Sequence, residues 1–163
     1  MNAPRIDPSA FVAAGAIIRG AVTIGPQAVV MFGAVLRAEE DEIVVGEATN
    51  LQDNVVVHCD AGFPVRIGAR TTIGHTAVVH GATIGDGCLV GIGALALNGS
   101  VLGEGAWLAA GSVLPEGKTV PPWTLAVGTP ARALRQLTDA EIERQRDGVR
   151  TYLRLGEMYR GTA

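Results

Sequence analysis

The chain has 163 residues, a length that suits one domain. Its net charge is −3 and 18% of its residues are charged, so no electrostatic argument favours nucleic acid or a membrane surface as a partner. No apolar run follows a basic start in residues 1–10, and no stretch approaches the roughly 18 apolar residues of a membrane span. Two cysteines, Cys59 and Cys88, are too few for a disulfide framework. We therefore expect a cytoplasmic protein with neither a nucleic-acid nor a membrane partner.

An aliphatic or small apolar residue recurs every six positions through most of the chain. These positions are Val12, Ile18, Ile24, Val30, Leu36, Val45, Leu51, Val57, Ile67, Ile73, Val79, Ile84, Val90, Ala96, Leu102, Leu108 and Leu114. Four places later stands a small or β-branched residue in most cases: Ala16, Val22, Ala28, Ala34, Thr49, Val55, Thr71, Ala77, Thr83, Cys88, Ala94, Ser100, Ala106 and Ser112. The composition of 22 glycines with only 4% aromatic residues agrees with a narrow, repetitive interior.

A period of six fits neither a 3.6-residue helix nor a simple strand alternation. It predicts a short strand and a corner, repeated, with three such faces closing one coil and coils stacked about 4.8 Å apart. The predicted fold is mainly β, a left-handed parallel β-helix of five to six coils with a C-terminal α-helix. The aliphatic residues would fill the axis, and the glycines that follow many of them would permit tight bends. A Gly/Val-rich β-sandwich is the alternative, and the long run in register disfavours it.

Three breaks in the register mark candidate functional segments. About three extra residues fall near 39–42, and about four extra form a predicted loop within 59–64. One residue is missing between Val79 and Ile84. Loops that leave a solenoid commonly carry function, and two of these breaks adjoin histidines.

The repeat stops after Pro121-Pro122, and Thr138-Asp139-Ala140-Glu141 has the pattern of a capping box. We expect a β-helix domain with a short N-terminal segment over 1–126. Residues 127–163 would form a linker and a helix from about 139 to 159 packed on the β-helix. Its apolar stripe consists of Ile142, Val149, Tyr152 and Leu153, interrupted by Gly148. Tyr152 and Tyr159 are expected to pack, and Tyr152 is kept as a candidate catalytic residue.

The register places two histidines in one outward-facing column. His58 and His80 both follow the aliphatic residue of their hexads and are separated by one whole coil. They should stand about 4.8 Å apart, close enough to share a metal ion at nitrogen distances of about 2.0–2.1 Å. Arg37 belongs to the same column, one coil earlier.

His75 lies on the preceding face, whose outward direction diverges from theirs. It therefore cannot join the pair within its own chain, but it can meet His58 and His80 of a neighbour if three β-helices pack with threefold symmetry. The spacing predicts a homotrimer with metal sites shared between subunits and ligands His58, His75 and His80.

The combination of these motifs resembles the γ-class carbonic anhydrase family. It includes Gly33-Ala34-Val35-Leu36-Arg37, the run from Thr49 to His58, Thr72-Ile73-Gly74-His75, Val79-His80-Gly81 and Pro130-Ala131-Arg132. The resemblance implies that the three histidines bind Zn²⁺, or Fe²⁺ or Co²⁺, at trimer interfaces. It implies reversible hydration of CO₂ to bicarbonate by metal-bound hydroxide.

The resemblance also implies roles for four other residues. Gln52 matches the glutamine that hydrogen-bonds water on the metal, with Asn50 as its polar neighbour. Arg37 matches an interface arginine, and Glu39 stands where the family usually has Asp. The longer side chain of Glu39 would preserve an Arg37–Glu39 ion pair between subunits, with a different reach. The archetypal member carries a long acidic loop with a proton-shuttling glutamate after the first histidine, whereas here the loop is short and Asp60 is its one ionisable carboxyl group. Metal binding is therefore better supported than fast turnover.

Three other functions remain open. Hexapeptide-repeat proteins include acyltransferases that use a histidine base, and some anhydrase-like relatives act as acyl-CoA thioesterases. The chain could also be a structural homotrimer that keeps its metal without turnover. Cys88 is expected to be inert in a corner, whereas Cys59, beside His58, could respond to oxidation.

Overall fold

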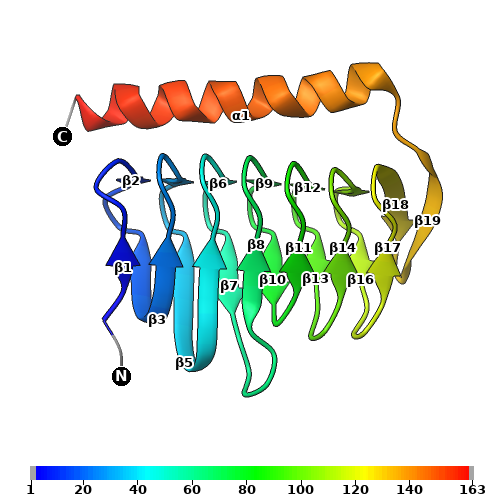
Figure 1. Ribbon diagram of the computed structural model, residues 1–163, viewed down its shortest axis with the longest axis horizontal. Coiled ribbons are helices and arrows are strands. Elements are labelled where there is room, and N and C mark those ends of the chain that lie inside the picture. The colour runs from blue at the N-terminus through cyan, green and yellow to red at the C-terminus, as the bar shows by residue number, and fades with distance from the viewer. Residues whose placement is uncertain (1–2, 162–163) are drawn as a thin grey trace.

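A computed structural model describes residues 3–161, which form a left-handed parallel β-helix of about 7 turns with one helix along it (Figure 1). The prediction of five to six coils was too low, because the parallel ladder extends beyond the clear hexads at both ends. Residues Arg5–Ile6 pair with the strand Ile17–Ile24, and residues Leu125 and Ala126, after the two prolines, still pair with Trp107 and Leu108.

The coils contribute to two sheets. The 11-stranded sheet contains two faces of the prism. Its strands are β1 (Arg5–Ile6), β3 (Ile17–Ile24), β5 (Val35–Val45), β7 (Val56–His58), β8 (Val65–Ile67), β10 (Val78–His80), β11 (Thr83–Ile84), β13 (Leu95–Ala96), β14 (Val101–Leu102), β16 (Val113–Leu114) and β17 (Thr119–Val120). The 8-stranded sheet is the third face. It consists of β2 (Phe11–Val12), β4 (Val29–Val30), β6 (Asn50–Leu51), β9 (Thr72–Ile73), β12 (Leu89–Val90), β15 (Trp107–Leu108), β18 (Thr124–Gly128) and β19 (Ala131–Gln136).

The predicted interior column is confirmed as the core. Its members from Ile18 to Leu114 are all buried, whereas Val12 in the first complete coil is only partly covered. The predicted corner residues are also buried, except for Ala16 in the first coil, which is partly buried, and Thr83. The missing residue after Val79 moves the corner to Ala82, which is fully buried, and leaves Thr83 exposed.

The glycines that follow the aliphatic residues serve a different purpose from the predicted bend. At Gly91, a Cβ atom would lie 2.5 Å from the backbone nitrogen of Ala110 in the next coil. That close approach of two backbones excludes a side chain. The bend itself falls two residues further along, at positions such as Gly93, which has a φ of 64°.

The two insertions take different forms. The extra residues at 39–42 lie inside β5, which spans Val35–Val45 and joins two faces by pairing with β7 through its first residues and with β8 through its last. The predicted loop within 59–64 is confirmed as the turn between β7 and β8, and it projects from the coil in Figure 1.

The C-terminal segment is more ordered than a linker. Strand β19 pairs antiparallel with β18, and α1 (Asp139–Arg160) then runs back along the coils (Figure 1). The predicted capping box at Thr138 and Glu141 is confirmed. The division of the chain at residue 126 stays a prediction, and β18 crosses it.

Helix α1 packs on the β-helix as predicted, but not only through its apolar stripe. Val149 is buried and Ile142 is partly buried, as expected. The buried Gln145 and Gly156 complete the contact. Gln145 Nε2 donates a 2.7 Å hydrogen bond to the carbonyl oxygen of Cys88, and Gly156 lies against Val29.

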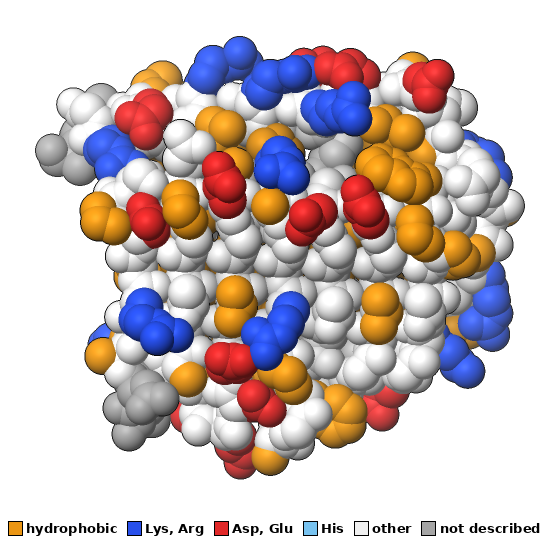
Figure 2. All heavy atoms as spheres, in the orientation of Figure 1, with side chains coloured by type: hydrophobic (Ala, Val, Ile, Leu, Met, Phe, Trp, Pro, Cys, Tyr) orange, Lys and Arg blue, Asp and Glu red, His pale blue; other side chains and the backbone are white. Residues whose placement is uncertain are grey.

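Acidic and basic side chains are interspersed on the face of the molecule shown in Figure 2. Within residues 3–161, no helix has the length and apolar character needed to cross a membrane.

Candidate metal centre

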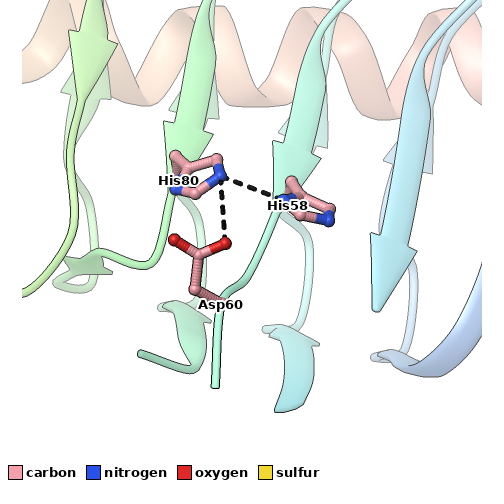
Figure 3. A group of neighbouring side chains, drawn as sticks. All are labelled: His58, Asp60 and His80. Atoms are coloured by element: carbon pink, nitrogen blue, oxygen red, sulfur yellow. Dashed lines mark hydrogen bonds and ion pairs between the residues drawn. The ribbon is translucent and has the colours of Figure 1, made fainter. Parts of the chain in front are cut away.

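The predicted histidine column is confirmed. His80 on β10 is in register with His58 on β7, and His58 is in register with Arg37 on β5. His58 Nδ1 and His80 Nε2 are 2.9 Å apart, and both side chains are partly buried (Figure 3). Parallel pairing therefore brings two imidazole nitrogens from consecutive coils to one point.

Asn98 determines which nitrogen of His80 is available. Its Oδ1 lies 2.8 Å from His80 Nδ1, and its Nδ2 donates a 2.8 Å hydrogen bond to Asp60 Oδ2. The carboxylate can only accept, so it fixes the amide orientation and makes the Asn98 oxygen face the ring. His80 Nδ1 therefore carries the proton, and the Nε2 lone pair points toward His58.

Two carboxylates flank the histidine pair. Asp60 Oδ1 is 3.8 Å from His80 Nε2, and Glu39 Oε2 is 3.5 Å from His58 Nε2. Glu39 also accepts a 2.5 Å hydrogen bond from Arg37 Nη1, and this contact lowers the pKa of the Glu39 carboxyl group below its ordinary value. The predicted Arg37–Glu39 pair thus exists within one chain. A role for it between subunits stays a prediction.

His75 lies apart from this pair in the same chain. Its Nδ1 is 2.9 Å from Asp53 Oδ2, and its Nε2 is 3.2 Å from the hydroxyl of Tyr152 on α1. Burial, and then the charge of Asp53, raise the pKa of Tyr152. Among residues 3–161, the group of His, Cys, Asp and Glu side chains close enough to hold one ion is His58, Asp60 and His80, without His75.

Gln52 and Asn50 form a buried polar row that leads to His75. Gln52 Nε2 donates to Asn50 Oδ1 at 3.2 Å, and Gln52 Oε1 accepts a 3.2 Å hydrogen bond from the backbone N–H of His75. Asn50 Nδ2 in turn donates to Thr72 Oγ1 at 2.9 Å. These contacts hold both side chains in fixed positions beside His75. The side-chain oxygen of Gln52 therefore faces the His75 backbone and not the His58–His80 pair.

Sequence reasoning missed the site contacts of three residues. Asn98 lies in the coil after His80, one residue beyond Leu97, because the ladder pairs Val79 with Ala96 and so places Leu97 opposite His80. Asp53 precedes His75 by 22 residues, the same interval that separates His58 from His80. Counting one coil back from His75 would have identified Asp53, whereas counting one coil on from His80 leads to Leu97 and not to Asn98. Asp60 was noted only as the ionisable group of its loop, because an insertion has no register from which to derive a contact.

The donor set fits a divalent transition ion. Two imidazole nitrogens 2.9 Å apart could each lie about 2.0–2.1 Å from one ion with an angle near 90° between the bonds, and an opening of a few tenths of an ångström would give a tetrahedral angle. The acceptor on His80 Nδ1 and the carboxylate near His58 Nε2 are the outer partners that metal-ligating histidines usually have.

Two cavities lie away from the histidine pair. One, of about 510 Å³, lies between α1 and the coil corners and is lined by Arg70, Trp107 and Trp123 among others. The second, of about 460 Å³, includes Gln52 and Gly74, so it reaches the residue beside His75.

These features define a hexapeptide-repeat left-handed β-helix with a paired-histidine centre on one face. A family model described as "Hexapeptide repeat of succinyl-transferase" matches residues 64–95 and 82–115. The chain is 49% identical over 152 residues to a Methanocaldococcus jannaschii protein named "Probable carbonic anhydrase", covering 93% of this chain and 96% of that one. It is 37% identical over 157 residues to a carbonic anhydrase of Geobacillus kaustophilus, covering 96% and 86%. The chain belongs to the γ-carbonic-anhydrase-like hexapeptide-repeat family.

A solved structure from Bacillus cereus has the same fold along almost the whole chain. Its TM-score is 0.97 at 32% identity, and the match covers 98% of this chain and 93% of that one. The Bacillus cereus protein carries a provisional acetyltransferase assignment.

Proposed function

We propose that the protein is a γ-class carbonic anhydrase-like enzyme that interconverts CO₂ and bicarbonate at a metal ion held by His58, His80 and the partner subunit's His75. The observation that carries the proposal is the 2.9 Å separation of His58 Nδ1 and His80 Nε2 in consecutive coils. The names of the two relatives, at 49% and 37% identity, support the same reaction. Zn²⁺ is the proposed ion, with Fe²⁺ or Co²⁺ as alternatives.

A bound ion would supply a Lewis acid that lowers the pKa of water enough to yield hydroxide near neutral pH. The chain's own residues would hold the ligands in place. Asn98 keeps the proton of His80 on Nδ1, and Glu39 lies near enough to His58 Nε2 to hold its ring from the other side. Gln52 and Asn50 would present fixed polar groups to the substrate, and Arg37 would keep Glu39 ionised.

The proposal requires three subunits, since His75 is outside the group formed by His58 and His80 in its own chain. Because Asp53 holds His75 Nδ1, Nε2 is the His75 nitrogen that would bind the ion of a neighbour. Tyr152 contacts that nitrogen, so the tyrosine would have to release it on assembly or metal binding. Tyr152 is therefore better suited to positioning His75 before assembly than to acting on substrate.

Stopped-flow CO₂ hydration is the test, with His80→Ala as the inactive reference. The wild type should exceed the variant by at least tenfold, contain close to one metal ion per chain, and migrate as a trimer. Hydration at the level of His80→Ala would refute the proposed reaction. A stable monomer that retains the full metal content would refute the shared site.

Acyl transfer or thioester hydrolysis is the second candidate, because the Bacillus cereus structure and the matching repeat family both carry transferase descriptions. Release of free thiol from acetyl-CoA, measured in the same preparation, separates the two. Thiol release lost in His80→Ala, together with absent CO₂ hydration, would favour the second candidate over the first. A metal-loaded trimer with neither activity would instead indicate a structural role.

A further inference from the structure

We propose that Asp60 is a metal ligand, and that His58, Asp60 and His80 form a two-histidine, one-carboxylate site for a divalent transition ion within a single protomer. The inference rests on the proposed function only in that both assign His58 and His80 as metal ligands. It adds that the protomer can bind its ion without the partner subunit's His75.

The three ligand atoms converge on one point (Figure 3). One nitrogen of each histidine and one Asp60 oxygen all lie within 4.8 Å of one another, with 2.9 Å between the nitrogens and 3.8 Å from His80 Nε2 to Asp60 Oδ1. Bonds of about 2.0–2.2 Å to one ion allow a nitrogen–oxygen separation of up to roughly 4 Å. The His80–Asp60 distance already satisfies this limit, so a small movement of the loop would complete the set.

The carboxylate is directed at this point by the same amide that directs His80. Asn98 accepts from His80 Nδ1 and donates to Asp60 Oδ2, which leaves Asp60 Oδ1 and His80 Nε2 facing the space between the rings. One side chain therefore orients two prospective ligands, an arrangement typical of the outer partners of a metal site.

The loop that carries Asp60 is anchored at several points. The backbone N–H of Gly62 donates to Asp41 Oδ2 at 3.1 Å, and Phe63 N donates to the Asp60 carbonyl oxygen at 2.9 Å. The Phe63 side chain lies against Gly81 and Gly99, two glycines of consecutive coils, and a Cβ at Gly81 would come within 2.8 Å of it. Asp60 is thus held near the histidines although its side chain is 46% exposed.

A carboxylate changes the chemistry of the centre. Two neutral imidazoles and one carboxylate would lower the net charge of the centre from +2 to +1 and leave further positions on the ion open, a ligand set that suits Fe²⁺, Co²⁺ and Zn²⁺. The exposure of Asp60 gives an ion direct access from solvent. The protomer could therefore load its ion before three subunits assemble.

Co²⁺ titration of the apoprotein, followed by the visible absorption of the bound ion, tests the proposal without any activity assay. His75→Ala should still bind close to one Co²⁺ per chain, and His75→Ala with Asp60→Asn should bind at least tenfold more weakly. His75→Ala with Asp147→Asn is the matched control, since Asp147 is an exposed carboxylate on α1. It should bind like His75→Ala.

Loss of Co²⁺ binding in His75→Ala, or equal affinity with and without Asp60→Asn, would overturn the proposal. If His75→Ala does not fold by circular dichroism, His75→Gln takes its place as the parent variant. Failure of the proposed function is distinct, because wild-type protein that binds Co²⁺ but does not hydrate CO₂ would leave the Asp60 result intact.

Discussion

Asn98 lies one coil beyond His80, and its side-chain oxygen is 2.8 Å from His80 Nδ1. The contact fixes the His80 tautomer and at the same time orients Asp60 through the amide nitrogen. A residue that touches neither substrate nor metal thus defines which atoms of the centre can bind an ion.

Asn98→Ala should weaken metal binding by about 10–100-fold, the usual effect of removing an outer partner of a metal ligand. The physical reason is that His80 would then adopt either tautomer and Asp60 would lose its amide donor. Zn²⁺ affinity measured by competition with a chromophoric chelator gives the result. Gln136→Ala, which removes an exposed amide side chain on β19, is the control. Unchanged affinity in Asn98→Ala would contradict the assigned tautomer role.

The Arg135–Glu141 pair predicts an acid-dependent stability. Arg135 makes two hydrogen bonds of 2.9 and 2.8 Å to the Glu141 carboxylate and lowers its pKa from 4.5 to about 2. A carboxyl group with a lowered pKa in the folded state stabilises the protein above its unfolded pKa, and that contribution is lost as the pH falls from about 4.5 to about 2. Melting temperatures of the wild type and Glu141→Gln should therefore differ at pH 7 and converge near pH 2.

Glu116→Gln, in an exposed turn, is the control for the effect on the melting temperature of removing one negative charge. If the difference in melting temperature between the wild type and Glu141→Gln is the same at pH 7 and pH 2, the pair does not titrate as described.

Glycine-to-alanine substitutions should have opposite signs at two positions. At Gly91 an added Cβ would meet the Ala110 backbone nitrogen at 2.5 Å, so the coils must separate. Overpacking of this kind costs about 1–3 kcal/mol and should lower the melting temperature by roughly 2–12 °C. At Gly148, inside α1, the nearest atom is Gln145 Oε1 at 4.0 Å, so alanine should stabilise the helix by about 0.5–1 kcal/mol. Thermal denaturation of the two variants tests both predictions. Equal shifts in melting temperature would refute the argument that the backbones approach too closely at Gly91.

Both cysteines should be unreactive in the native protein. Cys59 and Cys88 are buried, and burial raises the pKa of both thiols, that of Cys88 to about 12. Since the thiolate is the reactive species, a chromogenic disulfide reagent at pH 8 should label neither thiol in the folded protein and both after denaturation. Rapid native labelling of one thiol would favour the alternative that Cys59 responds to oxidation.

The hexad pattern was enough to predict the β-helix, its core and the His58–His80 column. The reason is that a strict period sets the register of stacked coils, and register alone decides which side chains become neighbours. The same arithmetic, extended to His75, would have reached Asp53 as well. It would not have reached Asn98, which lies one residue beyond the position opposite His80. It failed where the period breaks: the corner after Val79 moved to Ala82, and the residues at 39–42 became part of β5.

Only the tertiary structure decided how the non-repetitive segments meet the site. The loop after His58 folds back so that Asp60 faces His80, and α1 returns along the coils so that Tyr152 reaches His75. Neither contact follows from a spacing, because a loop anchored by its own hydrogen bonds and a helix docked by packing have no fixed register with the coils. The sequence by itself therefore determined the pair of histidines, whereas the fold determined which carboxylate and which amide surround them.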